Sequence, residues 1–149
     1  MKLPSLSSIF FLVGVLLAGP ALATDEVFTS GPFEVRVTPF PSTFLTPELA
    51  KKYGLPRSET QAVLNLSVYD TRIEAAVKTV PAQLTGQHRN LIGQAFGLEF
   101  QTIDEGEAIY YVAPFRISDE EIMTFEIEAL PEGARFPVNV RFNQKFYRQ

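Results

Sequence analysis

The chain has 149 residues, of which 46% are hydrophobic, and it carries a formal net charge of −4 with one histidine and no cysteine. The acidic balance argues against nucleic acid or an anionic lipid surface as a partner, because both attract basic patches. A single imidazole and no thiol exclude disulfides, thiol catalysis and a multi-histidine or thiolate metal site within one chain. We therefore predict neither a metal nor another cofactor.

The first 23 residues show the order of features that defines a secretory signal peptide. Lys2 lies in a short positive region, an apolar run covers 9–17, and Ala21-Leu22-Ala23 supplies the small residues of a cleavage site. The apolar stretch is shorter than the roughly 20 residues of a membrane-spanning helix. We expect cleavage after Ala23, one domain over 24–149, no transmembrane segment after cleavage, and a periplasmic location, with release from the cell as an alternative.

Apolar and polar residues alternate with a period of two through most of the remaining chain, which predicts half-buried β-strands. This alternation covers 33–38, 62–69, 96–101, 108–115, 123–129 and 136–146, with a weaker segment over 74–80. Asp104-Glu105-Gly106 and Pro131-Glu132-Gly133 separate neighbouring segments at hairpin spacing. About seven mostly antiparallel strands predict an immunoglobulin-like β-sandwich, with a small β-barrel as the alternative.

One helical signal interrupts the strand pattern between the first two segments. Thr46 is suited to the N-cap, Pro47 to the first helical position and Glu48 to the positive end of the helix. Gly54 is suited to a left-handed C-cap. The pattern predicts one short helix over 47–53, in a connection.

The polar stretch 84–94 is the first candidate site, and it contains His88, Arg89, Asn90 and Gln94. We predict a loop here, with His88 at the surface or in a hydrogen bond, because loops carry many binding residues. The competing interpretation is that Asn90 and Gln94 only satisfy backbone groups of an irregular connection. The sequence leaves both open, and it contains no glycine-flanked serine that would serve as a nucleophile.

Tyr110 and Tyr111 are the second candidate site. Adjacent residues of a strand point to opposite faces, so one of the two is expected to be exposed and to serve as an interface anchor. The acidic clusters 104–107 and 119–121 match no calcium-loop spacing. We interpret them as solvated charges at strand ends, and we predict no catalytic residues.

Four segments together resemble one family: 42–45, 62–68, 105–111 and 142–147. The chain is similar over 33–147 to an uncharacterised "domain of unknown function" family of small exported proteobacterial proteins. The resemblance implies an envelope location. It assigns no active site, so no catalytic residues are carried over.

These observations lead to two functional hypotheses. The first is a non-enzymatic periplasmic protein that serves as a protein-interaction or envelope-assembly module, with another envelope protein as its partner. The alternative is a small-ligand-binding or hydrolytic protein that uses the loop formed by His88, Arg89 and Asn90. The alternative predicts that these side chains converge on a concave pocket.

Overall fold

The computed structural model describes residues 25–74 and 79–148, so the predicted signal peptide lies outside the described residues. The five-stranded sheet has the order β1 (Glu26–Ser30), β2 (Phe33–Pro41), β3 (Gln61–Asp70), β7 (Ile109–Arg116) and β6 (Gln101–Asp104). The four-stranded sheet has the order β5 (Ala95–Gly97), β4 (Ala82–Arg89), β8 (Glu121–Pro131) and β9 (Val138–Phe146). All strand pairs within these sheets are antiparallel.

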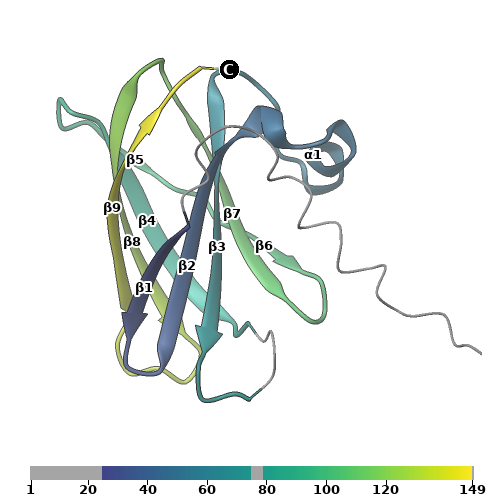
Figure 1. Ribbon diagram of the computed structural model, residues 1–149, viewed down its shortest axis with the longest axis vertical. Coiled ribbons are helices and arrows are strands. Elements are labelled where there is room, and N and C mark those ends of the chain that lie inside the picture. Colours follow the sequence, from purple (N-terminus) through teal and green to yellow (C-terminus); the bar gives the residue numbers. More distant parts are fainter. Residues whose placement is uncertain (1–24, 75–78, 149) are drawn as a thin grey trace, which may run out of the picture.

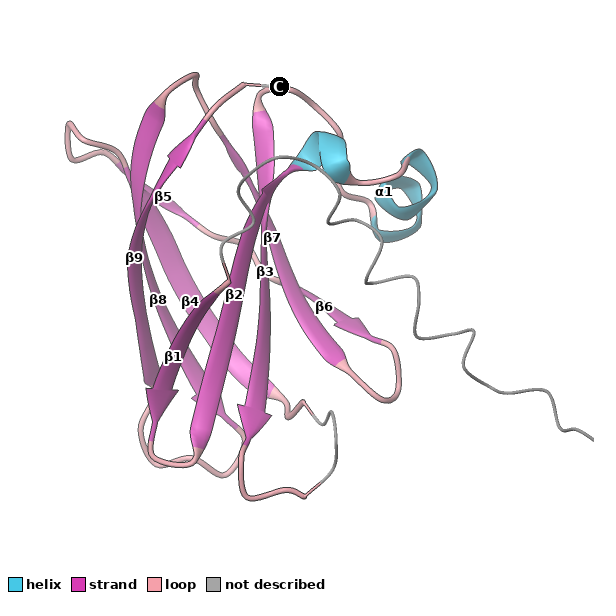
Figure 2. Ribbon diagram, viewed as in Figure 1, coloured by secondary structure: helices cyan, strands magenta, loops and turns pink. Residues whose placement is uncertain are grey.

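The two sheets lie face to face as a sandwich (Figures 1 and 2). The predicted immunoglobulin-like β-sandwich is confirmed. The described strands belong to two separate sheets, so the barrel alternative is wrong. No helix within the described ranges is long and apolar enough to cross a membrane.

The core lies between the sheets and is built from the inward positions of the alternating strands. On β2, Val35 and Val37 are buried while Arg36 between them is exposed, as the period of two predicts. Phenylalanine fills the centre: the Phe125 ring stacks on Phe142 at 4.9 Å and meets Phe115 edge-on at 5.1 Å. These are favourable aromatic geometries, and the contact of Phe125 with Phe115 on β7 connects the two sheets across the core.

The predicted helix is confirmed as α1 (Pro47–Tyr53), which follows a short 3-10 turn, η1 (Ser42–Phe44). The Thr46 hydroxyl accepts a hydrogen bond from the Leu49 amide, and Gly54 ends the helix with φ of 63°. The connection that carries α1 packs on the outer face of the five-stranded sheet. A second apolar cluster forms there around Leu55, Val63, Ile103 and Val112.

The structure differs from the predicted strands at one segment and adds two strands. The segment predicted as one strand over 96–101 is divided, because β5 belongs to one sheet and β6 to the other. Leu98 lies at this crossing, buried in the core, and its amide donates to the Gly86 carbonyl. Strands β1 and β4 were not predicted. Of the weak strand predicted over 74–80, residues 75–78 lie outside the described part, and Thr79 forms an isolated bridge with Tyr69.

Candidate functional site

The stretch predicted as a loop over 84–94 is a β-hairpin made of β4 and β5, with His88 opposite Phe96 and Arg89 opposite Ala95. Its turn is held by two side chains. The Asn90 side-chain amide donates to Gln94 Oε1 at 2.8 Å, and Asn90 Oδ1 accepts from the Gln94 backbone amide at 2.9 Å. Both residues therefore serve the turn, as the competing interpretation predicted. The loop prediction is wrong for residues 84–89, which belong to β4, while residues 90–94 form the turn of the hairpin.

His88 and Arg89 point to opposite faces of β4, because they are neighbours in a strand. The Arg89 guanidinium lies on the outer face, 3.4 Å from Glu126 Oε1 and 3.2 Å from the Gly93 carbonyl. His88 lies on the inner face and is only 6% exposed, so the prediction of a surface histidine is wrong. Its ring stacks on Phe96 with centroids 5.3 Å apart and contacts Phe115 at 5.5 Å.

His88 lines a cleft of about 700 Å³ that opens between the two sheets at one end of the sandwich. The β4–β5 hairpin and the C-terminus lie at this end (Figure 1). The apolar part of the cleft is formed by Phe96, Pro114, Phe115, Ile117 and Met123, and its polar part by Thr60, His88, Asn90, Gln94, Arg116, Ser118, Asp119, Glu121 and Arg148. Three of the predicted residues, His88, Asn90 and Gln94, therefore do converge on a concave site, and Arg89 does not.

The two acidic side chains of the cleft each use one oxygen to accept a hydrogen bond from a backbone amide, Glu121 within its own turn and Asp119 from the C-terminal end of the chain. Glu121 Oε2 accepts from the Ser118 amide at 2.8 Å, and Asp119 Oδ1 accepts from the Arg148 amide at 3.1 Å. Over residues 25–74 and 79–148, the guanidinium groups of Arg116 and Arg148 form no ion pair. The cleft therefore presents both signs of charge, with two guanidinium groups and two carboxylates that each use one oxygen.

Burial lowers the pKa of His88 below its ordinary value, and the negative charge of Glu121 partly opposes this shift. Nδ1 of the ring is buried without a hydrogen-bond partner in the described structure. A buried nitrogen without a partner loses its hydration and gains nothing in return. The neutral imidazole is therefore the favoured form in the folded protein.

We expect His88→Phe to raise the free energy of unfolding by about 1 kcal/mol near neutral pH, because phenylalanine buries no unpaired nitrogen. Below the ordinary pKa of 6.5, the unfolded chain takes up a proton that folded His88 resists. The free energy of unfolding of the wild type should therefore fall as the pH falls through 6.5. In the variant it should fall less steeply, because the variant lacks this imidazole. Urea unfolding at about pH 7.5 and about pH 5 measures both slopes. Equal slopes would contradict the assignment.

Tyr110 and Tyr111 lie outside the cleft. As predicted, they point to opposite faces of β7, but neither is freely exposed. Tyr111 is buried in the core, and its hydroxyl accepts a hydrogen bond from the Ala82 amide at 2.8 Å. Tyr110 is half-buried against the outer apolar cluster, and this burial raises the pKa of its phenol. The prediction of an exposed tyrosine anchor is therefore wrong.

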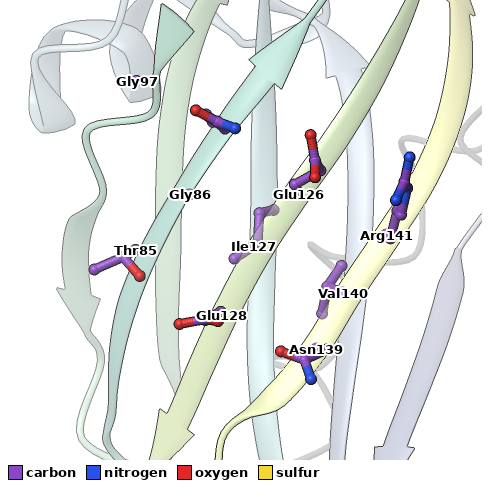
Figure 3. A pocket seen from close by; sticks show the side chains of 10 residues that line it. Thr85, Gly86, Gly97, Glu126, Ile127, Glu128, Asn139, Val140 and Arg141 are labelled. Atoms are coloured by element: carbon purple, nitrogen blue, oxygen red, sulfur yellow. The ribbon is translucent and has the colours of Figure 1, made fainter. Parts of the chain in front are cut away.

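A second hollow, of about 520 Å³, lies on the outer face of the four-stranded sheet (Figure 3). It is more open than the cleft and is bordered by outward-pointing side chains of β4, β8 and β9, among them Thr85, Glu128, Asn139 and Arg141. No aromatic side chain lines it. Such a surface is typical of the solvated face of a sheet, so the cleft is the stronger candidate.

Sequence reasoning missed four residues that shape the cleft: Phe96, Phe115, Arg116 and Arg148. They come from β5, β7 and the C-terminal end, far apart in the chain. The strand pairing that brings them together is not visible in the alternation pattern. The pairing of β4 with β8 places His88 opposite Phe125 in the core. Knowledge of this pairing would have indicated that His88 faces inward, toward the cleft.

The family model of the domain of unknown function DUF4426 matches residues 27–149. The chain belongs to the DUF4426 family. The predicted membership of a domain-of-unknown-function family is thereby confirmed. A solved DUF4426 family protein from Pseudomonas aeruginosa PAO1, PA0388, is 32% identical to this DUF4426 chain, with a TM-score of 0.73. The alignment covers 84% of this chain and 96% of that one. No curated protein matches the chain.

More distant structures share the fold of this DUF4426 protein. FetP of uropathogenic Escherichia coli strain F11, expressed recombinantly in the periplasm, is 12% identical with a TM-score of 0.58, over 83% of this chain and 94% of that one. A copper-bound variant of FetP is 13% identical with a TM-score of 0.59, over 84% of this chain and 91% of that one. At this level of identity the likeness concerns the fold alone.

Proposed function

We propose that this DUF4426 protein is a non-enzymatic periplasmic module that binds another envelope protein at the end of the sandwich where the His88 cleft opens. The observation that carries the proposal is the cleft together with the hairpin beside it. At the hairpin tip, Leu91 is 78% and Ile92 is 81% exposed, and the Phe96 ring is half exposed at the cleft. Adjacent apolar side chains beside a concave site are typical of an interface.

Within the described residues His88 is not part of a catalytic arrangement, which supports a binding role. An imidazole that acts as a base is oriented by an acceptor on its second nitrogen. In the described structure, Nδ1 of His88 has no such partner. Ser118 lies in the same cleft, but its backbone amide is bound to Glu121 and nothing pairs its hydroxyl with His88. The hydrolytic form of the alternative hypothesis therefore lacks support.

The copper of the FetP variant does not fit the residues of this chain. The sequence offers one imidazole and no thiolate, whereas copper sites in proteins are built from several histidine, cysteine or methionine ligands. No group of three or more histidine, cysteine, aspartate or glutamate residues gathers within the described ranges. We therefore base the proposal on the cleft and assign no step to a metal.

The periplasmic part of the proposal rests on the N-terminal pattern of Lys2, the apolar run and Ala21-Leu22-Ala23. We expect the intact mass of the protein from a periplasmic extract to correspond to a chain that begins at Thr24. Replacing Ala21 and Ala23 by arginine should retain the full-length form at the membrane. A full-length chain in the cytoplasm would contradict export.

In-cell photo-crosslinking tests the interaction. A photoreactive amino acid at Ile92 or at Ser118, both at this end, should give the same discrete adduct with one envelope protein. The matched control is Val27, an exposed apolar residue on β1 that does not line the cleft. Equal labelling at all three positions, or none at any of them, would show that this end of the sandwich is not an interface.

A free small-molecule ligand is the second candidate, because His88, Asn90 and Gln94 line a cleft of suitable size. It predicts that a small metabolite raises the melting temperature of the isolated protein in a concentration-dependent way. Ser118→Trp, which places a large ring in the cleft, should remove this shift. Stabilisation of the variant to the same degree would place the ligand elsewhere.

A further inference from the structure

We infer that strand β9 accepts an extended segment of a partner protein as an added β-strand, with acidic side chains on the outward face of that segment. This surface is separate from the His88 cleft, because no residue of β9 lines the cleft. The inference therefore goes beyond the proposed function and does not rest on it. It rests on the backbone groups that β9 leaves open at the edge of its sheet.

β9 forms the longest edge among the described strands. The other outermost strands, β1, β5 and β6, have five, three and four residues, whereas β9 has nine. Proteins protect sheet edges with short strands, prolines, bulges, inward charges or outward cations. β9 contains no proline, pairs with β8 in an unbroken register and has no charge on its buried face, so its protection is limited to the cations Arg141 and Lys145. Figure 3 shows Arg141 on β9, at the margin of the sheet.

The register of the sheet determines which backbone groups of β9 are free. In an antiparallel sheet, the N–H and C=O of one residue point toward the same neighbouring strand, and this direction alternates along the chain. The Glu132 amide binds the Pro81 carbonyl, so the even-numbered residues of β8 face β4 and the odd-numbered ones face β9. Their partners on β9 have even numbers. The odd-numbered residues therefore direct their N–H and C=O groups away from the sheet. They are Asn139, Arg141, Asn143 and Lys145.

The side chains along this edge favour an acidic partner strand. Over residues 25–74 and 79–148, neither Arg141 nor Lys145 forms an ion pair. Glu126 stands opposite Arg141 on β8, but its carboxylate is bound to Arg89, and Ile122 stands opposite Lys145. An added strand would place its own residues directly beside the two cations, at cross-strand positions where opposite charges attract. Two carboxylates four residues apart in that strand match the spacing of Arg141 and Lys145.

A second copy of this chain fits the edge less well than such a segment. Pairing of two β9 strands would gather two copies of Arg141 and of Lys145 on one face, and like charges across a strand pair are destabilising. The inward residues of an added strand would lie beside Phe28 of β1, which is partly buried and contacts Phe142 with ring centroids 6.1 Å apart. Apolar residues there extend the core. The fitting segment therefore alternates apolar with polar residues.

Amide hydrogen exchange followed by NMR tests the inference on the purified protein. The probe is a synthetic peptide as long as β9 that alternates valine with polar residues and carries glutamate at two outward positions four residues apart. The amides of Asn139, Arg141, Asn143 and Lys145 should exchange rapidly in the free protein and at least about tenfold more slowly with saturating peptide. The same peptide with lysine in place of glutamate should bind about tenfold more weakly.

Proline substitutions separate the backbone from the side chains. Asn143→Pro removes an outward N–H and should weaken binding of the glutamate peptide by at least about tenfold, whereas Asn143→Ala keeps that N–H and should bind like wild type. Thr102→Pro is the matched control, because Thr102 is an exposed residue of the edge strand β6 whose N–H points outward by the same alternation. It should leave binding unchanged. If Asn143→Pro fails to fold, Asn139→Pro near the start of β9 makes the same test.

Four results would overturn the inference. Unchanged exchange at the four amides in the presence of the peptide would show that the edge accepts no strand. An equal loss of binding in Thr102→Pro would place the peptide elsewhere, and equal affinity for the glutamate and lysine peptides would exclude an acidic partner. Protection of the same amides that grows with protein concentration in the absence of peptide, together with a dimer in sedimentation, would assign the edge to a second copy of this chain.

Discussion

Replacing Phe125 with alanine is expected to lower the free energy of unfolding by about 3–5 kcal/mol. Phe125 is 0% exposed and lies in the middle of β8, where its ring touches those of Phe142, Phe115 and Phe146. The loss combines the transfer of a large apolar group with the cavity left behind. β-Strands of both sheets surround this position and cannot collapse into the space without breaking their pairing. Urea unfolding followed by far-ultraviolet circular dichroism measures the change.

The matched control for this prediction is Phe136→Ala. Phe136 is 71% exposed in the connection between β8 and β9, so its truncation should change stability by no more than about 0.5 kcal/mol. Phe125→Leu should lie between the two, because it keeps most of the apolar volume. A loss below about 1 kcal/mol for Phe125→Ala would mean that the packing around this ring is loose.

The sandwich was predictable from sequence because most strands bury one face and expose the other. β8 shows this most clearly: Met123, Phe125 and Ile127 are buried, and Ile122 and Glu128 on the opposite face are exposed. The short helix was predictable for a different reason. Its caps are local interactions, so Thr46 and Gly54 specify the two ends without help from the rest of the chain.

β4 was not predictable by the same reasoning. Its inward positions include Leu84, Gly86 and His88, of which only one is aliphatic, and its outward positions are polar. β4 is a strand because β8 pairs with it along its whole length, from Ala82 to Arg89. Pairing of this kind is a tertiary effect that overrides weak local preference. The crossing of the chain between β5 and β6 was missed because the alternation continues through it.

The candidate site was predicted in part, and the reasons differ by residue. His88, Asn90 and Gln94 were found because polar side chains cluster there, yet Asn90 and Gln94 hold the turn and only His88 is buried. Tyr111 was misjudged because half-buried strands leave open which face is covered. The outer cluster that covers Tyr110 is formed by the distant α1 connection, which the local sequence of β7 does not reveal.

Gly86→Ala should destabilise the fold by about 1–3 kcal/mol through overpacking. A Cβ atom at this position would lie 2.8 Å from Ile127 Cγ1 and 3.1 Å from the Glu126 carbonyl oxygen. The first contact is a buried side chain and the second is backbone, so neither can withdraw without shifting β4 from β8. His88 lies two positions further along the same face of β4. We therefore expect the variant also to weaken the photo-crosslink formed at Ser118 in the cleft, and we would measure this alongside urea unfolding.

The control is Gly97→Ala, which changes the same residue type on the neighbouring strand. No atom lies within 4 Å of the added Cβ at Gly97. Its main effect should be to restrict the unfolded chain, which stabilises by about 0.4–1 kcal/mol. Opposite signs at Gly86 and Gly97 would show that close strand packing, and not glycine flexibility in general, sets the position of His88. If both variants are neutral, β4 can move away from β8 at little cost. The His88 cleft would then be adaptable and not preformed.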